Sequence, residues 1–206
     1  MARRIGPDCR ECRREGCKLF LKGERCTTKK CAMERRPVAP GQHGTGRKKV
    51  TEYGMQLREK QKVKKAYGIQ EKQFHKYYEE AERMKGVTGE NMLSLIERRL
   101  DNVVYRMGIG ASRKECRQIV NHCQITVNGR TVKTPSALVK VGDIIAVKEN
   151  KKELEQFKQL KDMKMVMPKW LEFNTETLTG KILALPTRED VDLNIKEHLI
   201  IELYSR

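Results

Sequence analysis

The chain of 206 residues carries a net charge of +17, and only 38% of its residues are hydrophobic while 34% are charged. This length allows one large domain or two small ones with a lean core, and the charge excess predicts an anionic partner, either nucleic acid or an anionic membrane. The apolar runs are too short to span a bilayer, and no apolar segment typical of a secretory signal follows the N-terminus, so we expect a cytosolic protein with reduced thiols.

The positive charge is concentrated in two segments. Residues 1–50 contain fifteen basic and five acidic side chains, and residues 99–150 contain nine and four. In the two other segments the charges are closer to balance: residues 51–98 contain ten basic and eight acidic side chains, and residues 151–206 contain ten of each. Contact with an anionic partner is therefore expected at the N-terminal and middle segments.

The N-terminal segment shows no sustained helical period, and prolines and glycines interrupt residues 37–46. We therefore predict an irregular, extended segment that needs something external to order it. Its regular feature is the spacing of its cysteines, which form one pair with two intervening residues and a second pair with four: Cys9, Cys12, Cys26 and Cys31.

Two short loops that each present two thiolates form the usual tetrahedral site for a structural zinc ion. Such a site has no open coordination position, so a catalytic ion is not expected. Disulfides or an iron–sulfur cluster are the alternatives. The fifth cysteine of the segment, Cys17, shares a face with Leu19 and Leu21 and is interpreted as a packing residue, although it could replace one ligand.

Three helices are predicted next, at about residues 53–67, 70–85 and 91–100, because these stretches are rich in helix formers and the first two end at glycines. Ser112 and Glu115 then form a capping-box pattern that opens a fourth helix, which ends near residue 123.

This fourth helix has two distinct faces. One carries the core positions Cys116, Ile119, Val120 and Cys123. The flank running to the opposite face carries Arg113, Lys114, Arg117 and Asn121. Charged flanks are commonly only solvated, but Glu115 is the sole acid of this helix, which favours contact with a phosphate backbone.

Strands are predicted around the Asn128-Gly129 pair, which is typical of a type I′ hairpin and places Arg130 at its tip. Residues 138–147 supply a further turn and strand. Residues 151–170 look helical, the segment after Trp170 is expected to form short strands and loops, and the last residues are predicted to form a buried strand or short apolar segment.

The middle segment resembles a known RNA-binding module. The resemblance is carried by RLDNVVYR (residues 99–106), the serine and arginines of 112–118, and the ITVNG run of 125–129. It is the module named after the bacterial small-subunit ribosomal protein S-four, which also occurs in RNA-modifying enzymes. PGQHG (40–44) and ELYSR (202–206), among other matches, extend the resemblance to that whole protein family.

The resemblance implies an α+β fold in three parts. These are a basic zinc-binding extension (1–45), a mainly helical domain (46–97, completed by about 175–206), and an inserted RNA-binding module with a helix pair and a small antiparallel sheet (98–160). It also implies that the zinc ligands are the four spaced cysteines.

In function, the resemblance implies a structural constituent of the small ribosomal subunit, not an enzyme. Such a protein is a primary binder of 16S rRNA at a junction in the 5′ domain, nucleates assembly, and contributes to translational accuracy through a neighbouring ribosomal protein. A weak contact with mRNA near its entry path is implied for Arg47, Lys48 and Lys49.

Charge and resemblance together predict the following RNA-binding residues: Arg3, Arg4, Arg10, Arg13, Arg14, Lys22, Arg36, Arg47, Lys48, Lys49, Arg58, Lys62, Arg113, Lys114, Arg117, Asn121, His122, Asn128 and Arg130.

Two alternative functions fit less well. An RNA-modifying enzyme would need a catalytic domain, for which no part of the chain is left over. A zinc-dependent DNA-binding regulator would need a reading helix after the cysteines, which the pattern does not predict. An irregular basic segment suits folded RNA better than duplex grooves, and the aromatic content of 5% argues against binding by single-strand stacking.

Overall fold

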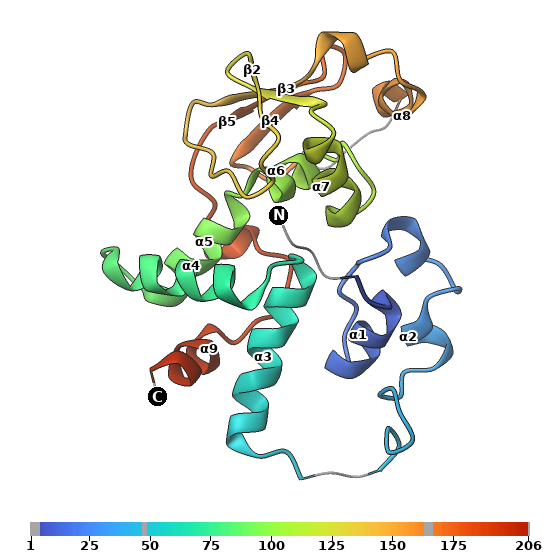
Figure 1. Ribbon diagram of the computed structural model, residues 1–206, viewed down its shortest axis with the longest axis vertical. Coiled ribbons are helices and arrows are strands. Elements are labelled where there is room, and N and C mark those ends of the chain that lie inside the picture. Colours follow the sequence, from blue (N-terminus) through green and yellow to red (C-terminus); the bar gives the residue numbers. More distant parts are fainter. Residues whose placement is uncertain (1–4, 47–48, 163–166, 206) are drawn as a thin grey trace. The chain divides into compact units, whose positions relative to one another are not determined.

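A computed structural model describes residues 5–46, 49–162 and 167–205, with the side chains of 161 and 162 left out (Figure 1). The chain divides into two compact units. The first comprises Met1–Met92 with Asp192–Arg206, and the second comprises Leu93–Val191. Within the described parts of the chain, no helix has both the length and the apolarity needed to cross a membrane.

The first unit begins with short helices that the sequence did not predict. They are α1 Asp8–Glu15, the 3-10 helix η1 Gly23–Cys26 and α2 Ala32–Arg35. Acidic residues lie in the first turn of α1 and arginines in its last turn, which complements the helix dipole, and Gly16 ends the helix in a left-handed conformation with φ 69°. The prediction of a wholly irregular segment was therefore wrong.

Helix α1 is attached to the long helix α3 (Glu52–Ala66) by ion pairs whose carboxylates are buried or nearly buried. Lys65 Nζ lies 2.5 Å from a carboxylate oxygen of Glu11 and 2.6 Å from one of Glu15, and Arg58 contacts Glu15 at 3.2 Å. The side chain of Glu15 is fully buried. Charges buried in this way are costly unless paired, so the four side chains tie the extension to the helical body.

The helices predicted from the sequence are present in the first unit and at its boundary. They are α3, α4 Glu71–Arg83 and α5 Thr88–Glu97. The C-terminal segment is a helix, α9 Glu197–Tyr204, and the prediction of a strand was wrong. Buried Ile200 lies in this helix, and the ring of Tyr204 lies 4.9 Å from that of Tyr78. Five buried or half-buried apolar positions in eight residues fit either element, so tertiary packing decides the outcome.

Gly89 has a specific role in this packing. A Cβ atom at this position of α5 would lie 2.7 Å from the Cβ of Glu197, the first residue of α9. The two helices therefore approach more closely than any residue with a side chain would permit.

The second unit combines helices with an antiparallel sheet (Figure 1). Its elements are α6 Leu100–Arg106, α7 Arg113–Asn121, β1 Ile125–Val127, β2 Arg130–Thr131, β3 Ile144–Val147, η2 Glu149–Lys151, α8 Glu155–Lys158, η3 Gln159–Asp162, β4 Leu171–Asn174, β5 Thr179–Ile182 and η4 Arg188–Asp190. The strand order is β2-β1-β3-β5-β4. Residues 151–162 thus form short helical turns rather than a continuous helix, and part of the remaining predicted stretch, 163–166, lies outside the described residues.

Pairing within the sheet corrects the predicted domain boundary. Ile145 of β3 lies opposite Gly180 of β5, and β5 pairs in turn with β4. Residues 175–191 therefore belong with the second unit and not with the helical first unit, to which they were predicted to contribute. The core of this unit lies between the sheet and the two helices, where Cys116, Val120 and Ile125 are buried.

Local turn chemistry in the second unit follows the sequence. Asn128 and Gly129 both have positive φ, 49° and 77°, so the predicted type I′ hairpin is confirmed. At the start of α7 the Ser112 hydroxyl accepts a hydrogen bond from the Glu115 amide at 3.3 Å, as a helix cap does. Cys123 ends this helix region with a left-handed φ of 57°, a conformation that glycine adopts at lower cost.

Candidate cysteine pocket and RNA-binding surfaces

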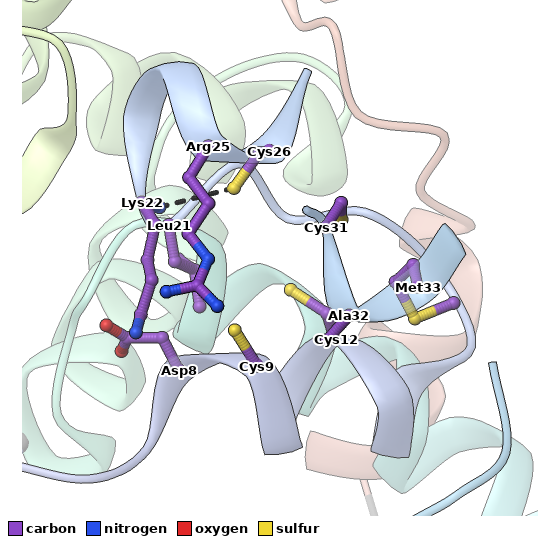
Figure 2. Close-up of a pocket in the computed structure, with 10 residues that line it drawn as sticks. All are labelled: Asp8, Cys9, Cys12, Leu21, Lys22, Arg25, Cys26, Cys31, Ala32 and Met33. Atoms are coloured by element: carbon purple, nitrogen blue, oxygen red, sulfur yellow. Dashed lines mark hydrogen bonds between the residues drawn. The ribbon is translucent and has the colours of Figure 1, made fainter. Parts of the chain in front are cut away.

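The four spaced cysteines line one pocket of the first unit (Figure 2). Cys9 and Cys12 lie on α1, Cys26 is the last residue of η1, and Cys31 precedes α2. The sulfur atoms of Cys9, Cys12 and Cys26 face a common space in Figure 2, and Cys31 lines the same pocket, although the four residues come from three separate elements. The two predicted pairs are therefore brought together by the folding of the extension.

The polar surroundings of this pocket are also defined. The Lys22 amide donates a hydrogen bond to Cys26 Sγ at 3.4 Å, and the side chains of Lys22 and Arg25 line the pocket beside Asp8. Burial, with a smaller contribution from the neighbouring thiols, raises the pKa of the Cys12 thiol to about 11, and a backbone hydrogen bond at Leu19 opposes this change. A thiolate at Cys12 therefore requires a compensating positive charge.

A set of four thiols presented by three short elements suits a structural zinc ion. Within residues 5–46, 49–162 and 167–205, however, no three histidine, cysteine or acidic side chains are arranged closely enough to hold a metal ion. A bound ion would have to draw the sulfur atoms closer together. Cys17 does not line the pocket; burial raises the pKa of its thiol, against a lowering by nearby Lys62.

The predicted RNA-binding residues of the first unit fall into two groups. Five are solvent-exposed: Arg10, Arg14, Lys22, Arg36 and Lys49. Three are used within the fold. Arg13 Nε donates to the Val38 carbonyl at 2.7 Å, Arg58 contacts Glu15, and Lys62 Nζ contacts Glu59 at 2.6 Å. The predictions at Arg3, Arg4, Arg47 and Lys48 fall outside the described residues.

Arg117 does not lie on the outer flank of α7, so its predicted position was wrong. It is only 8% exposed, and its Nη1 lies 3.2 Å from Asp101 Oδ2. Asp101 also accepts two hydrogen bonds from Arg99, at 2.6 and 3.0 Å. The acid on the preceding helix attracts the guanidinium inward, and a helical projection of α7 alone does not contain that information.

The other cations of α7 are more accessible. Arg113 Nε donates to Asn102 Oδ1 at 2.8 Å, and its guanidinium lies 4.5 Å from the ring centroid of Tyr105. These contacts orient the guanidinium and leave it partly exposed, as Lys114 also is. Asn121, the last residue of α7, is exposed, and so are His122 and Arg130 beyond the helix.

Asn128 is exposed, but its side chain serves the sheet. Its Oδ1 accepts a hydrogen bond from the Ile144 amide at 2.9 Å, and its Nδ2 donates to Asp143 Oδ1 at 2.9 Å. Because its oxygen and its nitrogen each form a hydrogen bond within the sheet, the side-chain amide fixes the hairpin against the start of β3. This role gives Asn128 a structural function whether or not it also contacts RNA.

A buried polar network behind α7 was not predicted from the sequence. Glu97, fully buried, accepts hydrogen bonds from Asn102 Nδ2 at 2.6 Å and from Arg106 Nη2 at 2.8 Å. Asn102 in turn holds Arg113. The signal for this network in the sequence is the run RLDNVVYR, whose charged residues occur within a largely apolar helix. Such a fully bonded network fixes a unique arrangement of the helices.

The second unit thus presents accessible cations on a helix and hairpin held by a rigid core, and the first unit presents a separate set on a cysteine-bearing extension. Together these features define a nucleic-acid-binding protein. Residues 3–97 match the family model for the ribosomal protein S4/S9 N-terminal domain, and residues 98–145 match that for the S4 domain.

Relatives agree with both matches. The chain is 62% identical to small ribosomal subunit protein uS4 of Caldicellulosiruptor bescii and 61% identical to that of Clostridioides difficile strain 630, over the full length of both partners in each case. The chain belongs to the uS4 family of small ribosomal subunit proteins. This confirms the family expected from the sequence, which is one of ribosomal proteins and not of enzymes.

Proposed function

We propose that the protein is a structural constituent of the small subunit of the cytoplasmic ribosome and binds the rRNA of that subunit. The observation that carries this proposal is the full-length similarity to uS4 proteins, together with an S4 domain whose α7 and β1–β2 hairpin carry accessible cations. Cations held by a rigid framework lose little conformational freedom on binding, which favours affinity.

We further propose that the two units bind rRNA through separate surfaces. Phosphate contacts position a protein on RNA without reading sequence, and shape selects a folded junction over a plain helix. A junction of helices in the 5′ domain of 16S rRNA would provide such a shape. Binding there early would allow the protein to nucleate assembly of the subunit.

Contacts with neighbouring proteins belong to the same proposal. We propose that one neighbouring small-subunit protein binds this chain at an interface that affects translational accuracy, and that Lys49, with Arg47 and Lys48, lies near the path of the mRNA. The exposure of Lys49 supports the second point. The remaining two residues lie outside the described parts of the chain.

For the cysteine pocket, we propose one structural zinc ion held by Cys9, Cys12, Cys26 and Cys31, with a disulfide or an iron–sulfur cluster as the alternatives. When bound, the ion supplies a covalent-like link between three short elements that bury few apolar side chains. The cysteines that would hold the ion are positioned by α1, η1 and the turn before α2. This link would hold the exposed cations of the extension in fixed positions.

The proposed function is tested by titrating the purified, zinc-loaded protein with the 5′ domain of 16S rRNA, beside duplex DNA of equal length, at increasing salt. We expect the rRNA to be preferred at high salt, because shape-specific contacts remain when the counterion-release contribution decreases. If both nucleic acids bind equally and both lose affinity steeply with salt, only a general attraction between polycation and polyanion is present.

A further inference from the structure

A second hollow lies on the extension beside the cysteine pocket. It opens to solvent and is lined by Glu24, Arg25, Thr28, Lys30 and Arg35. None of its three cations was among the RNA-binding residues predicted from the sequence. Their neighbours Lys29 and Arg36 do not line it. Adjacent basic residues that look equivalent in the sequence therefore differ in the structure, because only some of them line the hollow.

The positive charge of this hollow is not neutralised by the protein. Arg25, Lys30 and Arg35 are exposed, and across the described residues none of the three forms an ion pair or a side-chain hydrogen bond. Nearby Glu34 is already paired with Lys18, at 2.5 Å. Glu24 is the one acid in the lining, so the hollow keeps an excess of two positive charges.

The backbone that carries these cations is well anchored. Cys26 and Cys31, which bracket the loop, are both buried. Between them, the Thr28 hydroxyl donates to the Arg25 carbonyl at 3.1 Å and accepts from the Lys30 amide at 3.3 Å. The Cys31 amide donates to the Thr28 carbonyl at 3.0 Å. The Thr28 side chain thus fixes the turn and links the backbone positions of two of the cations.

We propose that this hollow binds adjacent phosphate groups of the rRNA backbone, an inference that rests on the proposed function. Arginine offers a planar fork of donors that matches phosphate oxygens, and lysine adds a compact point charge. Two arginines and one lysine around a single hollow provide both kinds of contact. The three residues position the extension on RNA and do not read its sequence.

Lys30 and Arg35 are the residues to change. Arg25 also lines the cysteine pocket, where Figure 2 shows it beside Lys22, so its removal would affect two sites. The double variant Lys30→Gln/Arg35→Gln removes two charges from the hollow. Lys29→Gln/Arg83→Gln is the matched control, because it removes two exposed charges of the same types from the first unit outside the hollow, at residues that are not among the predicted RNA contacts.

Binding of the zinc-loaded full-length variants to the 5′ domain of 16S rRNA is measured from about 0.1 to 0.4 M salt. For the hollow variant we expect affinity to fall about tenfold or more and the logarithmic salt slope to decrease by about two, one for each lost phosphate contact. The control is expected to change the slope by less than one. Circular dichroism and zinc content check that both variants remain folded.

The outcomes separate this inference from the proposed function. If the unmodified protein prefers rRNA at high salt and both double variants change the slope equally, the hollow has no special role and the inference is wrong. If the unmodified protein shows no preference for rRNA over duplex DNA, the proposed function itself fails. If the affinity and the salt slope decrease for Lys30→Gln/Arg35→Gln and not for the control, the result supports both the inference and the proposed function.

Discussion

The cations of the extension and those of α7 differ in their surroundings. In the extension, residues such as Arg14 and Lys30 are exposed. On α7, Arg117 is buried against Asp101 and Arg113 is held by Asn102. A count of positive charges therefore predicts, in both regions, that the partner is negatively charged. It predicts which residues contact that partner only where no acidic side chain of the fold lies within reach of the cation.

The largest expected effect concerns the cysteine pocket that supports the extension. If the pocket holds zinc, Cys9→Ser is expected to abolish stoichiometric zinc binding. Residues up to about 40 are then expected to become accessible to protease, because these short elements bury little apolar surface of their own. The second unit is expected to remain folded. Zinc content by mass spectrometry and limited proteolysis provide the measurements.

Cys17→Ser is the control for this experiment, because Cys17 does not line the pocket. This variant is expected to retain zinc. If Cys9→Ser retains a full equivalent of zinc, the proposed ligand set is wrong. If that zinc disappears once Cys17 is also replaced, Cys17 acts as a substitute ligand.

The second prediction concerns the buried cation of α7. Arg117→Ala is expected to lower the free energy of unfolding by about 3 kcal/mol, at the low end for breaking a buried ion pair, because Asp101 keeps its bonds to Arg99. Urea denaturation followed by circular dichroism measures the change.

Lys114→Ala, on the same helix but partly exposed, is the control, with an expected change below about 1 kcal/mol in stability. Weaker RNA binding by the folded Lys114 variant would mark it as a contact residue. An Arg117 variant of unchanged stability but reduced RNA affinity would contradict the structural role of Arg117 and restore its role as a surface contact.

Much of the second unit could be predicted from local sequence rules. The hairpin at Asn128-Gly129 and the capped start of α7 depend on residues that are neighbours in the chain, and both were found where predicted. The inward position of Arg117 depends instead on Asp101, sixteen residues earlier. The helical periodicity of α7 alone could not predict that contact.

The first unit shows the same limit. The cysteine spacing predicted which four residues would gather, but α1 was missed because its one buried residue, Cys12, produces no apolar period. The helix is instead stabilised by its contacts with Lys65 and Arg58 on α3, which lie about fifty residues away in sequence. The C-terminal helix was missed for a related reason, because packing on α3 and close approach at Gly89 select it.

A third prediction examines how firmly the extension is attached to α3. Lys65→Met is expected to lower the free energy of unfolding of the first unit by about 2 kcal/mol, since buried Glu15 keeps Arg58 as its remaining partner. Faster proteolysis of α1 is expected to accompany this change. Lys64→Met is the control, because its partner Glu71 is nearly half exposed and its loss is expected to cost less than about 1 kcal/mol. Equal effects of the two variants would show that the buried pairs do not hold the extension.

The smallest expected effect is a pH dependence at the C-terminal helix. Burial alone would raise the pKa of Glu71, but hydrogen bonds from Lys60, Lys64 and Tyr204 outweigh it and lower the pKa from 4.5 to about 2. A lowered pKa in the folded state means that the stabilisation is fully present above about pH 4.5 and is lost as the pH falls toward 2. Because the side chain is 45% exposed, the contribution is expected to be at most about 1 kcal/mol.

Thermal unfolding of the protein and of Glu71→Gln between pH 6 and pH 2 measures this contribution. The two melting temperatures are expected to differ at pH 6 and to converge as the pH falls, since protonated glutamate and glutamine are both neutral. Glu80→Gln is the control, because this exposed residue of α4 forms no ion pair within the described chain, and its melting curve is expected to follow that of the unmodified protein. A difference for Glu71→Gln that stays constant with pH would mean that the glutamine disturbs packing around Tyr204 rather than removing a charge.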